Sequence, residues 1–252
     1  MNKKTYRIIG LVCLITGMFF LVFLGVVSIW GEIEATFFNA GLKSDEPLST
    51  LVCPAVITNN EVGIVSGSFY NPSDKIINME VRTYVTNGYV SLMDEIINNF
   101  TLDPGENKIV EVPVTADDAA YNRIVMVRMH QMKRIPLPYQ NAACGIVVVN
   151  LPFLTGTQFI ILTIGLGVLL SAGGITLWAI NAKPIVWDRL RIFQAMIFLA
   201  VTAFASTVTS LLNLWALALI ITIVWLLMGL SMIWQFSTSP RKKVVTNHKI
   251  PE

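Results

Sequence analysis

Two cysteines, Cys53 and Cys144, are the residues whose type and position predict a definite chemical reaction. If they lie on the oxidising side of a membrane, we expect them to pair, because disulfides form and persist there. The bond would close a loop of about 90 residues, worth ~4–5 kcal/mol in the chain-entropy model. The third cysteine, Cys13, lies in an apolar run and is predicted to be a thiol buried in the membrane.

Adjacent carboxylates are the next candidates for chemistry. Asp94 and Glu95 are neighbours in the sequence, as are Asp117 and Asp118. Paired acids can serve as general acid and base or as calcium ligands. These pairs lie in predicted turns, where such acids are usually solvated, and they do not fit the D-x-[DN]-x-[DN]-G calcium loop. We therefore favour solvated surface residues over a catalytic or metal-binding role.

Other reactive patterns are absent from the sequence. It has two histidines, His130 and His248, which the topology predicted below puts on opposite sides of the membrane. There is no zinc-ligand cluster, no H-E-x-x-H, no G-x-x-x-x-G-K and no G-x-S-x-G. We predict no catalytic residue, no metal ligand and no cofactor, and we expect the protein not to be an enzyme. Asn99 begins an Asn-Phe-Thr pattern and is a candidate N-glycosylation site.

Charge is divided unevenly along the chain. Hydrophobic residues make up 54% of the sequence and charged residues only 13%, which is not typical of a soluble protein. Residues 31–156 carry 14 of the 16 acidic residues and have a net charge of −6, whereas the rest of the chain has a net charge of +8. Nucleic-acid-binding domains carry a basic surface, whereas the middle of this chain is acidic. We therefore expect no nucleic-acid partner.

Three uncharged runs predict the membrane segments. Residues 8–30 lack charge over 23 positions, enough for a helix of roughly 34 Å across a hydrocarbon core of ~30 Å. A cleaved signal peptide is the competing interpretation, but its apolar region is usually shorter and ends in a small-residue site. We favour a retained anchor. Residues 158–180 form a second run, which is long enough for one crossing.

The third uncharged run, residues 192–234, covers 43 positions and is too long for a single crossing. It predicts two helices, residues 192–210 and 214–234, with the turn within the polar cluster of residues 207–213. In the second run, Gly167 and Ser171 are four residues apart, a spacing that lets membrane helices approach closely. We favour helix packing by this pair over a ligand or ion site.

Short basic segments predict the sidedness. Residues 1–7, 181–191 and 235–252 are basic, and four crossings put all three on one side of the membrane. The positive-inside rule assigns that side to the cytoplasm. We therefore predict a multi-pass protein of the cytoplasmic membrane, with both termini cytoplasmic and residues 31–156 extracytoplasmic.

Between the first two membrane segments, the hydrophobic period changes to two. Residues 77–85 alternate between apolar and polar side chains, as half-buried strands do. Turn sequences such as the Asn-Gly pair at residues 87–88 separate such stretches. Residues 31–52 are polar and unpatterned and predict a tether, whereas residues 53–152 predict a β domain. The candidate strands are residues 52–58, 63–70, 76–86, 99–102, 108–114, 123–132 and 145–151.

Seven short strands in about a hundred residues are typical of an immunoglobulin-like sandwich. Residues 117–121, Asp-Asp-Ala-Ala-Tyr, resemble the tyrosine corner of immunoglobulin domains, although a Tyr packed at a strand end is the alternative. Arg123 stands where an antibody domain has its second cysteine, and the third strand has no tryptophan, so the resemblance implies the architecture alone. In such sandwiches part of the first strand runs parallel to the last, which would bring Cys53 and Cys144 together at the membrane-distal end.

The expected fold is an α+β membrane protein with four transmembrane helices, one before and three after an inserted all-β, immunoglobulin-like sandwich. Uncharged membrane segments disfavour an ion or proton pathway. Besides the lipid bilayer, we expect a protein partner or a second copy, bound through the β domain or the second membrane helix. The expected function is non-enzymatic binding at the cell surface. The alternative is an accessory subunit of a membrane transport, secretion or energy-converting complex.

Overall fold

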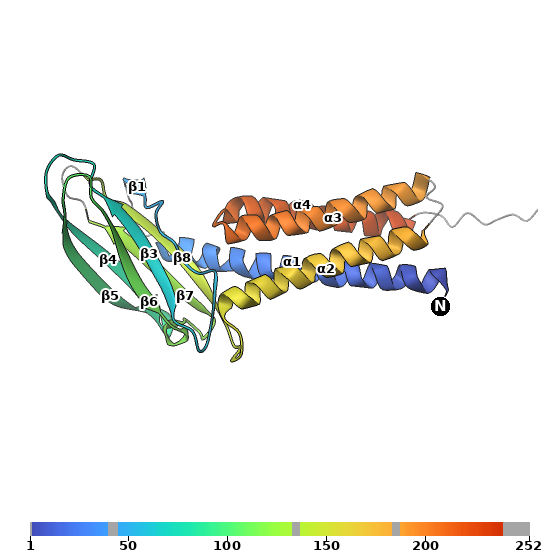
Figure 1. Cartoon of the computed structure of the whole chain (residues 1–252), viewed down its shortest axis with the longest axis horizontal. Helices are drawn as coiled ribbons and strands as arrows, with labels where there is room; N and C mark the ends of the chain where they lie inside the picture. The colour runs from blue at the N-terminus through green and yellow to red at the C-terminus, as the bar shows by residue number, and fades with distance from the viewer. Residues whose placement is uncertain (1, 40–44, 133–136, 183–186, 239–252) are drawn as a thin grey trace, which may run out of the picture.

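The computed structural model describes residues 2–39, 45–132, 137–182 and 187–238. Figure 1 shows an elongated molecule with a β domain at one end and a bundle of long helices at the other. Outside the described residues lie residue 1, residues 40–44 of the predicted tether, residues 133–136 of the predicted β domain, residues 183–186 of the predicted loop and residues 239–252 of the predicted tail, which include His248.

Four helices in the described part of the chain are long and apolar enough to cross a membrane, by length and composition. They are α1 (Lys3–Asn39), α2 (Gly156–Asn181), α3 (Trp187–Leu211) and α4 (Trp215–Thr238). The division of the last uncharged run into two helices is therefore confirmed. The chain turns between α3 and α4 at Asn213, which has a positive φ of 60°.

Helix α1 is longer than the sequence predicted. It contains 37 residues and ends at Asn39, so the prediction of a tether from residue 31 is wrong for residues 31–39. This last part of α1 lies on the β domain, where the backbone of Gly31 packs on Gly145 and Ala35 is fully buried. Packing on a distant strand stabilises the helix here, and an unpatterned sequence gives no sign of it.

The β domain contains a six-stranded and a two-stranded sheet. The larger sheet has the order β1-β8-β7-β4-β5, with β2 also paired to β8, and the smaller sheet pairs β3 with β6. One hydrophobic core contains buried residues of both sheets, such as Val81 and Val127 from the larger and Val65 and Val112 from the smaller. The strands are β1 (Glu46–Pro47), β2 (Val56–Thr58), β3 (Gly63–Tyr70), β4 (Ile77–Asn87), β5 (Tyr89–Leu102), β6 (Asn107–Val114), β7 (Ile124–Gln131) and β8 (Gln140–Val149).

Strand β5 differs most from the prediction. It runs over Tyr89–Leu102 rather than residues 99–102 and pairs with β4 along most of its length. A hairpin joins the two strands at Gly88, whose φ is +70°. Most of β5 is exposed on both faces of the sheet. A strand that is exposed on both faces need not alternate apolar with polar residues, and the period-two pattern that revealed the other strands is therefore weak here.

The first and last strands run parallel, as the resemblance to immunoglobulin domains implied. Both β1 and β2 pair in parallel with β8. A disulfide joins Cys53 to Cys144, with the two Cα atoms 6.5 Å apart. Strand β8 begins at Gln140, earlier than predicted, so Cys144 lies in its middle and not at a distal end.

The predicted tyrosine corner is not present. The Tyr121 side chain is 65% exposed and forms no hydrogen bond with the residues that the structure describes. Tyr121 instead has a φ of 54°, and its backbone N–H donates to the Gly88 carbonyl. It is part of a turn between β6 and β7 that contacts the β4–β5 turn.

Helices α1 and α2 pack closely through small residues. A Cβ added at Gly17 of α1 would lie 2.5 Å from Ser171 Oγ and 2.6 Å from the Gly167 carbonyl oxygen, so the backbones meet without an intervening side chain. Gly10 and Gly174 make a second such contact. Gly167 and Ser171 therefore lie at a packing contact between two helices of the same chain. Small residues allow membrane helices to approach each other this closely.

Hydroxyl groups join α3 to the other helices. Thr207 Oγ1 donates to the Leu21 carbonyl of α1 at 2.8 Å, and Ser210 Oγ donates to the Gly25 carbonyl at 3.1 Å. Ser206 donates to the carbonyl of Ala218 in α4 at 3.2 Å. Thr207 and Ser210 belong to the polar cluster that predicted the α3–α4 turn, but both lie inside α3 and, with Ser206, hold it against its neighbours.

Glu61 connects the β domain to the start of α2. Its Oε2 atom accepts the backbone N–H of Gly156 at 2.6 Å and the backbone N–H of Thr58 at 3.2 Å. A carboxylate at a helix N-terminus satisfies a free N–H group and complements the helix dipole. Thr155 and Gln158 form a capping box beside it.

Candidate interaction surface

An edge strand with exposed apolar residues is the main candidate for a functional surface. Strand β5 lies at the end of the six-stranded sheet and, among the described strands, pairs only with β4. Its other edge therefore presents backbone N–H and C=O groups that another chain could pair with. Five large apolar side chains of β5 are 36–58% exposed. We call them the β5 apolar set: Tyr89, Leu92, Met93, Ile96 and Ile97.

The β5 apolar set occupies both faces of the strand. Register with β4 puts Met93 and Ile97 on one face, opposite Thr86 and Arg82, and Ile96 on the other face, opposite Thr83. Helix α1 covers β7 and β8 but leaves the β4–β5 end of this sheet open. An exposed edge strand with apolar residues on both faces is a site where a partner can bind or chains can aggregate.

A polar network borders this surface on the face that carries Ile97. Glu95 Oε1 accepts the Tyr84 hydroxyl at 2.6 Å and lies 3.2 Å from Arg82 Nη1. The hydrogen bond from Tyr84 holds the pKa of Glu95 below its ordinary value, and the same bond raises the pKa of Tyr84. Arg82 also contacts Glu80 at 2.7 Å. Arg82 thus pairs with two carboxylates, Glu80 and Glu95, so the network carries one more negative than positive charge.

Aromatic and basic side chains continue the same face toward α1. The Arg128 guanidinium lies 4.7 Å from the ring centre of Tyr84 and 5.2 Å from that of Phe38. His130 lies between the rings of Tyr84 and Tyr139, at 5.3 and 5.8 Å. Burial, followed by the charges of Arg128 and Arg82, lowers the pKa of His130 below its ordinary value of 6.5. The cluster anchors the end of α1 to the sheet.

The structure separates the carboxylates that the sequence singled out. Asp94 accepts a hydrogen bond from Asn87 at 3.0 Å, and Glu95 belongs to the network above. Asp118 accepts the Thr115 backbone N–H at 2.6 Å, which caps a short 3₁₀ helix, while Asp117 is exposed. Within the described ranges, no three His, Cys, Asp or Glu side chains lie close enough to hold a metal ion.

Asn99 is exposed on β5, opposite Glu80 of β4. The accompanying Thr101 is exposed as well. The side chain therefore lies on the same face as Ile97, two residues along the strand. A glycan at this position would cover part of the candidate surface, which connects this candidate modification with partner binding.

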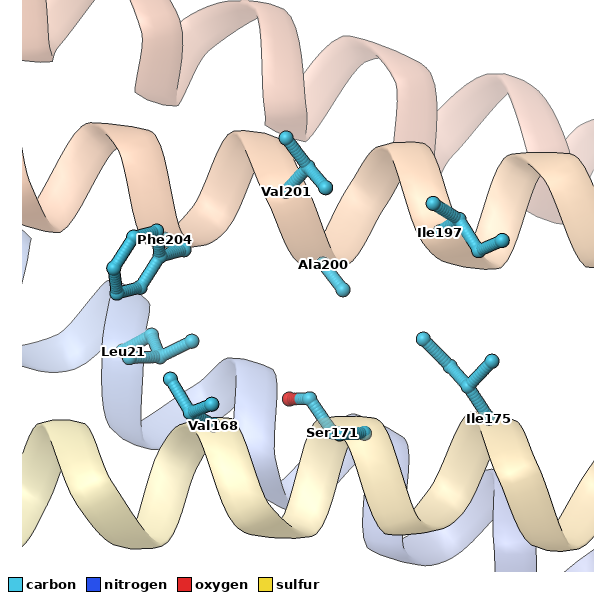
Figure 2. A pocket seen from close by; sticks show the side chains of 9 residues that line it. Leu21, Val168, Ser171, Ile175, Ile197, Ala200, Val201 and Phe204 are labelled. Carbon is cyan, nitrogen blue, oxygen red and sulfur yellow. The ribbon is translucent and has the colours of Figure 1, made fainter.

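A second candidate surface is an apolar groove in the helical bundle. Figure 2 shows side chains of α2 and α3 facing each other, with Leu21 of α1 between them. The groove has a volume of about 250 Å³. Ser171 is the polar residue among those that line the groove, and its Oγ atom is buried without a hydrogen-bond partner in the part of the chain that the structure describes. The walls are Val168, Ser171, Ala172 and Ile175 of α2 and Ile197, Ala200, Val201 and Phe204 of α3.

Sequence reasoning missed the β5 apolar set because it recognised only the last four residues of that strand. A signal was present in residues 89–97, which combine aromatic and branched apolar residues after an Asn-Gly turn. That these side chains are exposed depends on the three-dimensional position of β5 beyond the smaller sheet, which the sequence does not give.

No protein-family model matches the chain, and no curated protein matches it with significance. Solved structures with local similarity include Bacteroides uniformis beta-glucuronidase 2 covalently bound to cyclophellitol-6-carboxylate aziridine, at 15% identity and a TM-score of 0.28. A crystal structure of Bacteroides uniformis beta-glucuronidase matches at 13% identity and the same TM-score of 0.28. Each match covers 39% of this chain and 12% of the other. This similarity is too low to assign a fold or an activity.

Proposed function

We propose that the protein is a non-enzymatic membrane protein whose β domain binds another protein through β5. The observation that carries this proposal is the open edge of β5 together with the exposure of Tyr89, Leu92, Met93, Ile96 and Ile97. Backbone pairing along a free edge supplies affinity, and side chains on alternate faces supply specificity. We expect the partner to contribute an extended segment.

The proposed architecture is an immunoglobulin-like sandwich on the extracytoplasmic side of the cytoplasmic membrane. The parallel pairing of β2 with β8 and the core shared by two sheets support the architecture. The disulfide between Cys53 and Cys144 supports an oxidising location, and the basic segments support cytoplasmic termini. Protease added to intact cells should digest the β domain and spare a C-terminal epitope. Loss of the epitope with a protected domain would reverse the orientation.

Site-specific photo-crosslinking in the full chain tests the binding surface. A photoreactive residue at position 97 should capture a discrete partner, because Ile97 is 48% exposed in the β5 apolar set. Ile64 of β3 is also 48% exposed and is the matched control on the other sheet. The Ile97→Lys variant should lose the partner and Ile64→Lys should retain it. Equal capture from both positions, or no effect of Ile97→Lys, would contradict the proposal.

The alternative function, an accessory subunit of a larger membrane complex, is favoured by the groove between α2 and α3. Its walls are apolar except for Ser171, whose buried hydroxyl lies against Gly17 of α1. A transmembrane helix of a partner would fill the groove with apolar side chains. The small-residue face at Gly167 is already covered by Gly17 and Leu21 of α1, so such a partner would have to bind beside this face.

Crosslinking inside the membrane distinguishes the two functions. Val168 in the groove is 39% exposed, and Val224 of α4 is a comparable valine, 42% exposed, outside it. Capture of a membrane subunit from position 168 but not from position 224 would support the accessory subunit. Capture from position 97 alone would support recognition by the β domain. Capture from neither position would exclude both functions in the cells tested.

A further inference from the structure

A pocket with two opposite charges lies where α1 leaves the membrane. Trp30 and Glu34 of α1 form one wall, and Tyr121 and Arg123 before β7 form the other. The cavity has a volume of about 480 Å³, within the range of small-molecule sites. Between these walls the lining is apolar and comes from Val90, Ala120, Ile124 and Met126. We call this cavity the Trp30 pocket.

The Trp30 pocket lies at the level of the membrane surface. Trp30 is the last residue of the uncharged run that begins at residue 8, and Trp is enriched at the boundary between lipid tails and water. The carbonyl of Arg123 accepts the backbone N–H of Val148 at 2.8 Å, close to the point where the chain leaves β8 for α2. Phe153, on that connection, is 92% exposed. The pocket therefore lies near the point where α1 leaves the membrane and near the point where the chain enters it again before α2, beside the lipid headgroups.

The two charged groups of the pocket have capacity for a ligand. Arg123 is exposed, and its guanidinium forms no ion pair with the described residues. Glu34 Oε1 accepts the indole N–H of Trp30 at 3.1 Å, while Oε2 accepts no hydrogen bond from the described residues. Arg123 and Glu34 do not pair with each other across the cavity. One wall therefore offers donors to an anion, and the other offers an acceptor and an aromatic face to a cation.

We propose that the Trp30 pocket binds the headgroup of a zwitterionic phospholipid with a primary ammonium, as in phosphatidylethanolamine. The phosphate accepts hydrogen bonds from Arg123, whose planar guanidinium suits phosphate oxygens. The ammonium donates to Glu34 Oε2 and lies against the Trp30 indole. The apolar residues at the base contact the glycerol and the start of the acyl chains. The pocket adjoins the start of β5 through Val90 and Tyr121, whose ring lies 6.1 Å from that of Tyr89. The proposal does not depend on partner binding at β5 or on which side of the membrane the β domain occupies.

The chemistry of the pocket separates three lipid classes. Phosphatidylglycerol carries the phosphate but no cation, so Glu34 would remain unpaired beside it. Phosphatidylcholine carries a cation without an N–H donor, so it cannot donate to Glu34 Oε2, although the Trp30 and Tyr121 rings both offer it an aromatic face. A primary ammonium has three donors and matches a carboxylate with a free oxygen.

Native mass spectrometry of the full chain tests the proposal. The protein would be purified in detergent, freed of lipid and titrated separately with phosphatidylethanolamine, phosphatidylcholine and phosphatidylglycerol of identical acyl chains. We expect the first complex to form at the lowest lipid concentration. Arg123→Gln and Glu34→Gln should each weaken it about tenfold, since each removes a charge-assisted hydrogen bond. Glu34→Gln should also abolish the preference for phosphatidylethanolamine over phosphatidylglycerol.

Arg191→Gln is the matched control. Arg191 is an exposed arginine near the start of α3, at the opposite boundary of the bundle, and this variant should bind lipid like the unmodified chain. The proposal is overturned if the unmodified chain does not prefer phosphatidylethanolamine to both other lipids. It is also overturned if Arg123→Gln and Glu34→Gln bind as Arg191→Gln does. The comparison of the three lipids uses the unmodified protein. It therefore tests the proposal even if one of the variants fails to fold.

Discussion

Gly145 of β8 lies directly against Gly31 of α1, and a Cβ added at Gly145 would collide with the carbonyl oxygen of Gly31. A helix that begins in the membrane segment is thus packed onto the sheet without a flexible joint in between. The position of the β domain relative to the bundle depends on this contact.

Substitution at this contact should loosen α1 from the sheet. Gly145→Ala introduces a methyl group against backbone atoms that cannot rotate away, and we expect a loss of about 3 kcal/mol in unfolding free energy. Gly63→Ala is the control, because its Cβ would meet only side chains, with Ile57 nearest at 2.9 Å. Chemical unfolding of the full chain in detergent measures both. A Gly145→Ala variant as stable as Gly63→Ala would show that the contact is not tight.

The disulfide should contribute strongly to the stability of the β domain. Cys53 and Cys144 are 91 residues apart, and the chain-entropy model gives about 4.5 kcal/mol for a loop of this length. The double substitution Cys53→Ser with Cys144→Ser should lower the unfolding free energy by about this amount. Cys13→Ser, which removes the free cysteine, is the control and should have little effect. If the double variant were as stable as the Cys13→Ser variant, the disulfide would have no role in stability.

Glu61 should stabilise the connection between the β domain and α2. Glu61→Gln keeps the shape of the side chain but removes the charge that accepts the Gly156 N–H at 2.6 Å. We expect a loss of about 1 kcal/mol, from a weaker hydrogen bond and a weaker interaction with the helix dipole. Hydrogen exchange at the first turn of α2 should become faster. Glu111→Gln, an exposed site on β6, should leave that exchange unchanged.

His130 should make the domain sensitive to acid. Its pKa in the folded protein is lowered from 6.5 by burial, so between this lowered value and 6.5 the unfolded state binds more protons than the folded state. The stabilisation is therefore fully present above pH 6.5 and is lost as the pH falls through the folded pKa. His130→Phe keeps a ring between Tyr84 and Tyr139 but cannot titrate, and its stability should fall less between pH 7 and pH 5. An unchanged pH dependence would assign the effect to other groups.

Local patterns in the sequence revealed the elements that alternate or lack charge. The uncharged runs predicted the helices that are long and apolar enough for a membrane, and the alternation in residues 77–85 predicted β4. The pairing of Cys53 with Cys144 followed from their number and expected location. These features depend on composition and period within a short window, which is the information a single sequence holds.

Features that depend on distant contacts were not visible in the sequence. The last turns of α1 are helical because they pack on Gly145 and its neighbours, more than a hundred residues away. Strand β5 is long because β4 pairs with it, although its side chains face water on both sides. For the same reason the β5 apolar set and the Trp30 pocket could not be predicted, since both are defined by what the fold leaves uncovered.

Packing between α1 and α2 gives the last prediction. Gly17→Ala puts a methyl group 2.6 Å from the Gly167 carbonyl oxygen, and because that backbone must shift, we expect a loss of about 1–3 kcal/mol. Gly165 lies on α2, and a Cβ added there would have nothing within 4 Å. Gly165→Ala should therefore leave the unfolding free energy unchanged or raise it by up to about 1 kcal/mol, the difference in helix propensity. Unfolding in mixed detergent micelles compares the two variants. If Gly165→Ala lowered the unfolding free energy more than Gly17→Ala, the exposed face of α2 would contribute more to stability than its contact with α1, and the prediction would be wrong.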